Sequence, residues 1–167
     1  MEWGLQSSRA EIRYDQPDPE SLLLLGEVAY LSALCPRHRH WPAEVVHSAL
    51  GPAVRRRQVR VIRDQDGYPR AAVVWAYVSD DVHKALLQKG GLIRPQDWDS
   101  GPNLWLIDVL APFGHGLQVA RFIARNPPPR PFWYIRSGED GTVHKAVECD
   151  ITRGRRGFVK TIARELM

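Results

Sequence analysis

The sequence predicts a mixed α/β fold, with a central, mainly antiparallel sheet flanked by helices. Three observations predict it. First, helical apolar spacing near the N-terminus is followed by a hairpin pattern over residues 58–78. Second, residues 104–110 form a nearly continuous apolar run typical of a buried strand. Third, two more strand patterns follow a glycine-containing turn at residues 112–116. At 167 residues and 44% hydrophobic content, the chain is large enough for one sizeable core.

Two helices are expected at the start of the folded region. Apolar residues recur at helical spacing over residues 21–34, and this helix must end before Pro36 because proline restricts the residue that precedes it. Pro42 suits the first position of a second short helix, which the Gly-Pro pair at 51–52 is expected to close. Residues 35–42 are therefore a constrained loop between two helices.

The middle of the chain predicts the first part of the sheet. Strands over residues 58–63 and 71–78 are separated by the Asp-Gly turn at 66–67, which indicates a hairpin. A helix is expected over residues 80–88, and residues 90–102 have the composition of a loop.

The C-terminal part of the sequence predicts the remaining strands of the sheet and two more helices. Residues 104–110 form a strand, and the turn after it leads into a helix over residues 117–125. Strands are expected over residues 132–136 and 142–149. Residues 155–167 are predicted to form a final amphipathic helix.

Domain organisation follows from where periodic apolar spacing begins. Residues 1–19 are polar and contain two prolines, so we expect a flexible leader, followed by one domain over residues 20–167. The leucine-rich stretch near the N-terminus is broken at residues 26–27 by Gly and Glu, which argues against a membrane span or a signal peptide.

Composition limits the compartment and the partners. Cys35 and Cys149 are the only two cysteines, too few for a disulfide framework, which favours a reducing, cytoplasmic compartment. Lys and Arg exceed Asp and Glu by 23 − 19 = +4, a mild basic excess that favours an acidic partner. Nucleic-acid binding is not expected, because no exposed aromatics interleave with the basic runs at residues 55–57 and 155–156.

Two histidines and one aspartate are candidates for chemistry. His38 and His40 lie in the proline-bounded loop, where either imidazole could act as a base or could simply hydrogen-bond a carbonyl. Asp108 interrupts the apolar strand, and a buried carboxylate is costly unless it is paired. A histidine partner would give the base and carboxylate used in acyl transfer, whereas an arginine partner or a local cap would be structural. No third ligand for a metal is apparent.

A glycine turn is the third candidate. Gly114 and Gly116 follow a strand and open a helix, so backbone N–H groups here could contact a phosphate or an oxyanion. The alternative is a tight turn in which the glycines only permit chain reversal.

Three segments, in this order, resemble the RTX toxin-activating lysine acyltransferase family: CPRHRHWP at residues 35–42, QDWDSG at residues 96–101 and WLIDVLAPFG at residues 105–114. The resemblance extends over roughly residues 25–149. Its most specific part is the Asp-containing strand that ends in Ala-Pro-Phe-Gly.

The resemblance implies a fold similar to the Gcn5-related N-acyltransferases. It further implies that no cofactor stays bound, that acyl-acyl carrier protein is the donor co-substrate, that internal lysines of an RTX protoxin are the acceptors and that the chain forms a homodimer. The family's essential histidine falls on His38 and its essential aspartate on Asp108. The family usually has serine where this chain has Cys35, so Cys35 is assigned no catalytic role.

The mechanism expected from these residues is direct transfer. His38, oriented by Asp108, takes a proton as a lysine amine attacks the donor thioester, while Gly114, Gly116 or nearby N–H groups steady the oxyanion. A base is needed because a lysine pKa of about 10.4 leaves roughly one amine in 2,500 neutral at pH 7. A covalent acyl-enzyme is the competing route. Two other functions stay open: a coenzyme A-dependent small-molecule N-acyltransferase and a non-catalytic basic binding module.

Overall fold

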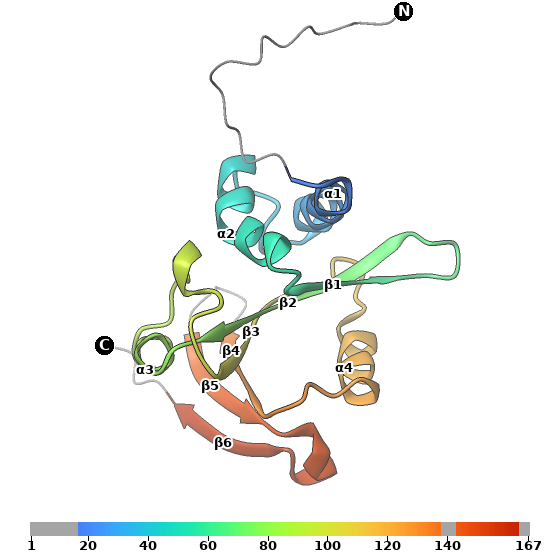
Figure 1. Ribbon diagram of the computed structural model, residues 1–167. Coiled ribbons are helices and arrows are strands. Elements are labelled where there is room, and N and C mark those ends of the chain that lie inside the picture. Colours follow the sequence, from blue (N-terminus) through green and yellow to red (C-terminus); the bar gives the residue numbers. More distant parts are fainter. Residues whose placement is uncertain (1–16, 138–142, 164–167) are drawn as a thin grey trace, which may run out of the picture.

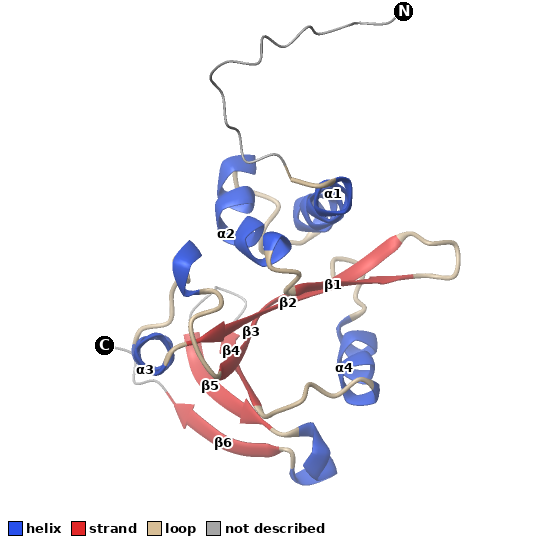
Figure 2. Ribbon diagram, in the orientation of Figure 1, coloured by secondary structure: helices blue, strands red, loops and turns tan. Residues whose placement is uncertain are grey.

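The computed structural model describes residues 17–137 and 143–163 of the chain, which contain both helices and strands (Figure 2). The helical elements are α1 (Pro19–Leu34), α2 (Ala43–Arg55), α3 (Asp80–Gln88), α4 (Gly116–Arg125) and two short 3-10 helices, η1 (Pro95–Asp97) and η2 (Ile151–Arg156). The strands are β1 (Val59–Arg63), β2 (Pro69–Val78), β3 (Asn103–Leu110), β4 (Phe132–Ser137), β5 (Val143–Cys149) and β6 (Phe158–Ala163).

The six strands form one sheet in sequence order, which confirms the predicted α/β class with a mainly antiparallel sheet. Every neighbouring pair is antiparallel except β3 and β4, which are parallel. A parallel pair needs a crossover, and α4 provides it. Helices α1 and α2 lie on one face of the β1–β3 part of the sheet and α4 lies on the other (Figure 1).

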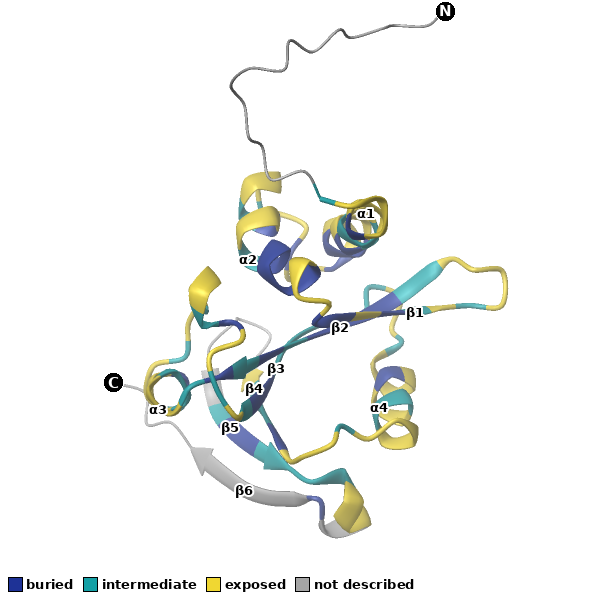
Figure 3. Ribbon diagram, in the orientation of Figure 1, coloured by how far each residue is buried: buried dark blue, intermediate teal, exposed yellow. Residues whose placement is uncertain are grey.

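Each face of the sheet has its own apolar cluster, consistent with the alternation of side chains along a strand. On the α1–α2 face, buried residues of β2 such as Val74 and Ala76 pack with Val28, Leu31 and Leu50 of the two helices. On the α4 face, the cluster is smaller and consists of Ala71, Val73 and Val119 with partly buried neighbours. Figure 3 shows the buried β2 between the two layers.

The predicted C-terminal helix over residues 155–167 is wrong. Residues 158–163 form β6, which pairs antiparallel with β5, and η2 precedes it. Three of the six residues of β6, namely Val159, Thr161 and Ile162, are β-branched and therefore favour a strand. Residues 164–167 lie outside the described part of the chain.

The predicted end of the second helix is also wrong. Helix α2 does not close at Gly51 and Pro52 but continues to Arg55, and the N–H of Arg56 still donates to the carbonyl of Pro52. The residues from Gly51 to Val54 are buried. Burying this turn against the sheet offsets the hydrogen bond that proline cannot make.

The remaining elements match their predictions within a few residues. The hairpin of β1 and β2 forms around the turn at Gly67, which adopts a φ of +86°, and α3 covers the predicted residues.

Residues 1–16 of the predicted leader lie outside the described part of the chain. Of the helices in the described ranges, none has both the length and the hydropathy that crossing a membrane requires.

Candidate active site

The loop between α1 and α2 holds His38 through a set of backbone hydrogen bonds. The N–H groups of His38 and Arg39 both donate to the carbonyl of Cys35, at 2.9 and 2.8 Å, and the N–H of Trp41 donates to the carbonyl of His38 at 2.8 Å. Cys35 caps the end of α1, and Pro42 caps the start of α2. The imidazole therefore projects from a turn that is fixed at both ends by helices.

A β-bulge in β3 aims Asp108 at this loop. Val74 of β2 pairs with Asp108, but the next residue, Trp75, pairs with Leu106, so Ile107 is an extra residue in β3. Such a bulge interrupts side-chain alternation and can redirect a side chain. Asp108 consequently lies on the α1–α2 face with Val74, whereas strict alternation from Leu106 would have placed it on the α4 face.

The two predicted residues meet. Nε2 of His38 lies 2.7 Å from Oδ2 of Asp108, with the side chains 1% and 10% exposed. Oδ1 of Asp108 accepts a 2.8 Å hydrogen bond from the N–H of Val109. The imidazole stands edge-on to the ring of Trp41, with 4.6 Å between ring centroids. The carboxylate is thus held by one backbone donor while its other oxygen faces the imidazole.

The histidine ring retains hydrogen-bonding capacity. Within the described residues, neither Nδ1 nor Nε2 of His38 makes a well-aligned hydrogen bond, so the contact between Nε2 and Asp108 is close but not linear. A buried ring nitrogen without a partner is costly. Nδ1, the nitrogen that does not face Asp108, is buried and has no hydrogen-bond partner among the described residues.

The structure separates the two candidate histidines. His40 is exposed, and its Nε2 accepts a 3.1 Å hydrogen bond from Nε of its neighbour Arg39. It has no carboxylate partner among the ion pairs of the described residues. Of the two imidazoles in the loop, His38 is the one that has the environment of a positioned base.

Gly114 and Gly116 form the predicted turn between β3 and α4. Gly114 has a φ of +76°, a left-handed conformation that favours glycine, and Gly116 is the first residue of α4. The residue before the helix, His115, makes no side-chain cap, so no side chain satisfies the first N–H groups of α4. No hydrogen bond or ion pair of the described residues links this turn to the His38–Asp108 pair.

The other sequence features contribute less to the site. Cys35 and Cys149 are both free thiols, and burial raises the pKa of the Cys149 thiol. Arg57 of the basic run forms ion pairs with Asp18 and Glu20, so part of this predicted patch is neutralised internally. The side chains of the second basic run, at residues 155–156, are outside the described part.

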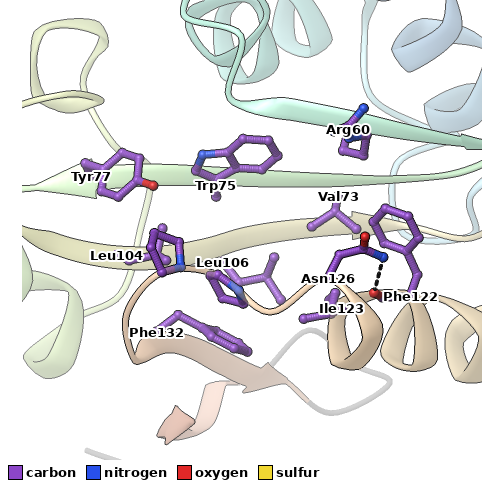
Figure 4. Close-up of a pocket in the computed structure, with 12 residues that line it drawn as sticks. Arg60, Val73, Trp75, Tyr77, Leu104, Leu106, Phe122, Ile123, Asn126 and Phe132 are labelled. Atoms are coloured by element: carbon purple, nitrogen blue, oxygen red, sulfur yellow. Dashed lines mark hydrogen bonds between the residues drawn. The ribbon is translucent and has the colours of Figure 1, made fainter. Parts of the chain in front are cut away.

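Sequence reasoning missed a pocket of about 250 Å³ on the α4 face. In Figure 4 its walls are side chains of β2 and β3 on one side and of α4 on the other. Its lining is mainly apolar and includes Val73, Trp75, Leu104, Leu106, Phe122 and Phe132. The signal available in the sequence was only the alternation along these strands, and alternation does not predict an unfilled space.

Comparison with known proteins points to one family. Residues 19–147 match the RTX toxin acyltransferase family. The chain is 34% identical over 125 residues to the RTX-I toxin-activating lysine-acyltransferase ApxIC of Actinobacillus pleuropneumoniae, an alignment that covers 75% of this chain and 72% of that protein. It is 33% identical over 127 residues to the protein-lysine myristoyltransferase HlyC of Escherichia coli, covering 76% and 72%.

A relative from a third genus is similar at the same level. The lysine-acyltransferase RtxC of Vibrio cholerae is 33% identical over 102 residues, covering 61% of this chain and 67% of that protein. The stretch that matches the family contains both His38 and Asp108. The chain therefore belongs to the RTX toxin acyltransferase family and is an acyltransferase.

Proposed function

We propose that this protein transfers a fatty acyl group from acyl-acyl carrier protein to internal lysine side chains of an RTX protoxin and thereby activates it. The observation that carries the proposal is the contact between His38 and Asp108, 2.7 Å apart in a largely buried position. The names of the relatives, which describe lysine acylation and toxin activation, support the acceptor class.

The chemistry follows from the geometry of the pair. The lysine amine attacks the carbonyl carbon of the thioester, a C–N bond forms, and Nδ1 of His38 takes the amine proton. The C–S bond then breaks, and the carrier thiol leaves with a proton. Asp108 stabilises the imidazolium that forms, because its carboxylate faces the opposite ring nitrogen.

The oxyanion of the tetrahedral intermediate needs hydrogen-bond donors. We propose that the uncapped N–H groups at the start of α4, next to Gly114 and Gly116, supply these donors. The alternative role for these groups is to bind a phosphate group of the acyl carrier protein donor. Both roles require only backbone groups, which agrees with a turn that contains two glycines.

The test is the intact mass of an RTX protein after incubation with acyl-acyl carrier protein and this enzyme. Wild-type enzyme is expected to add an acyl mass to lysine, and His38→Ala is expected to lower the rate by roughly 10²- to 10⁴-fold. His40→Ala is the matched control because it removes an exposed imidazole from the same loop, and it should keep wild-type activity.

Two outcomes would contradict the proposal. Turnover retained in a folded His38→Ala variant would remove the histidine from the mechanism. Transfer from acyl-coenzyme A to small amines, with none to RTX proteins, would replace the donor and acceptor classes.

Further parts of the proposal concern the setting of the enzyme. We place it in the cytoplasm, as one domain over residues 20–167, and without a cofactor that stays bound. A homodimer is proposed as well. Support for it comes from exposed apolar side chains on α1, namely Leu22, Leu23, Tyr30 and Leu34. Mass measurement of the protein in solution tests the dimer directly.

A further inference from the structure

The pocket on the α4 face has the shape of a trough rather than of a compact cavity. Its lining extends along β2 from Val73 to Tyr77, a span of about 13 Å at the rise of an extended strand. Phe122 and Ile123 of α4 form the opposite wall (Figure 4). At about 250 Å³ it lies just below the usual size of a ligand pocket, which suits a thin apolar chain.

Apart from Arg60, which is exposed, the polar groups along the trough are few. The side-chain Nδ2 of Asn126 donates to the carbonyl of Phe122 at 2.9 Å. At one end, the guanidinium of Arg130 lies 5.5 Å from the ring centroid of Tyr77 and donates to the carbonyl of Pro102. The interior therefore offers little to a polar ligand and a continuous surface to a hydrocarbon.

The trough leads toward the candidate active site. Strands β3 and β4 pair only from Leu104 to Leu106, with Phe132 to Tyr134 opposite, although both strands continue further. Leu106 lines the trough, and the pairing ends just where the bulge turns Asp108 to the other face. The trough and the His38–Asp108 pair thus lie on opposite faces of the sheet at the place where β3 and β4 stop pairing.

Apolar surface continues toward that place. The ring of Tyr134 lies 6.2 Å from that of Phe132, on the same side of β4 by alternation. Burial raises the pKa of the Tyr134 phenol, so the group stays neutral. From Asp108 back to Leu104 is about 13 Å along β3, a distance that a long fatty acyl chain can span.

We propose that this trough holds the fatty acyl chain of the donor thioester. The thioester would lie beside Asp108 and the methyl end of the acyl chain near Tyr77. The inference rests on the proposed function, and it assigns chain-length selection to Phe122 and Ile123 of α4. A wall that moves toward the sheet shortens the accepted chain, and a wall that recedes lengthens it.

The experiment compares donors with eight-, twelve- and sixteen-carbon chains on acyl carrier protein, measuring their binding and transfer. Ile123→Trp fills the trough and should weaken binding of the sixteen-carbon donor at least about tenfold while leaving the eight-carbon donor unchanged. Ala124→Trp, an exposed position of the same helix, is the matched control and should change neither. Phe122→Ala should shift preference toward longer chains.

Two results would overturn the inference. One is a wild-type length profile in an Ile123→Trp protein whose circular dichroism shows that it is folded, with Phe122→Ala equally without effect. The other is a photoreactive group at the chain terminus that crosslinks to α1 or α2 instead of to β2 and α4. Free sixteen-carbon fatty acid is a further arm: length-dependent binding of the free acid, with none of the thioester, would assign the trough to another lipid and reject the proposal.

Binding measured in His38→Ala separates this inference from the proposed function. That variant should bind donors with the wild-type length profile, because His38 lies on the other face of the sheet. If neither the wild type nor any variant transfers acyl groups to lysine, but the α4 substitutions still change the chain-length dependence of donor binding, the proposed function is wrong and the trough assignment stands. If transfer occurs and the α4 substitutions leave the chain-length dependence of donor binding unchanged, only the trough assignment is wrong.

Discussion

The two faces of the sheet differ in what they bury. The α1–α2 face carries the larger apolar cluster and also buries the contact between His38 and Asp108. The α4 face has a smaller apolar cluster and no comparable pair among the described residues, but it leaves a trough of about 250 Å³. One face thus positions polar atoms closely, whereas the other provides apolar space.

This difference indicates a division of labour within one sheet. Dense packing around a histidine and a carboxylate limits their motion, which general-base catalysis requires. An unfilled apolar space reduces stability and is therefore expected where a ligand fills it. The bulge at Ile107 is the local feature that keeps the two functions on separate faces, because it turns Asp108 away from the trough.

The largest effect is expected from Asp108→Asn. The variant keeps the shape of the side chain and an oxygen for the N–H of Val109 but loses the charge that stabilises the imidazolium, so transfer should fall roughly 10²- to 10⁴-fold. Its thermal unfolding midpoint should not fall, since Asn fills the same space and can keep the hydrogen bond from Val109. A midpoint that drops along with activity would instead indicate a structural role.

A second prediction compares two leucines of β3. Leu110 is fully buried on the α1–α2 face, whereas Leu104 borders the trough. Leu110→Ala should lower the free energy of unfolding by about 4 kcal/mol, and Leu104→Ala by about 2 to 3 kcal/mol, because the second change enlarges a space that is already unfilled. Denaturant unfolding measures both; equal losses would mean that the two faces are packed alike.

A smaller effect is expected from the ion pair that joins α1 to β1. Nε and Nη2 of Arg63 donate to the two oxygens of Glu27 at 2.8 and 2.6 Å. Arg63 is partly exposed, so Arg63→Ala should cost less than about 1 kcal/mol of unfolding free energy, and the cost should shrink further in high salt. A loss that is large and independent of salt would show that α1 depends on this pair for its docking.

The smallest effect concerns acid stability. Hydrogen bonds from the side chain and the backbone of Ser21 lower the pKa of Asp18, which caps α1. A carboxyl group whose folded-state pKa is depressed contributes stability above its unfolded pKa and loses it as pH falls through the folded value. Asp18→Asn retains a capping oxygen and should weaken the decline of the unfolding midpoint in acid. Identical acid profiles would contradict this.

Local signals explain which elements could be predicted. The hairpin depends on Gly67 in its turn, and α3 begins where the side chain of Ser79 accepts a hydrogen bond from the N–H of Val82. Both signals lie within a few residues of the structure that they specify. The end of α2 and the strand β6 were predicted wrongly because burial of Pro52 and pairing with β5 are contacts between distant segments.

The candidate site was predicted in its residues but not in its geometry. The pattern of the loop left His38 and His40 equivalent, and the family resemblance favoured His38. Only the folded chain buries His38 against Asp108 and leaves His40 in solvent.

The sequence by itself therefore determined the order of the elements up to β5, the candidate residues and the family resemblance, because turns, caps and periodic patterns are local properties. The tertiary structure alone decided which way Asp108 faces and where the trough lies. A bulge exists only when two strands pair, and a cavity exists only where side chains from distant segments fail to fill the space between them.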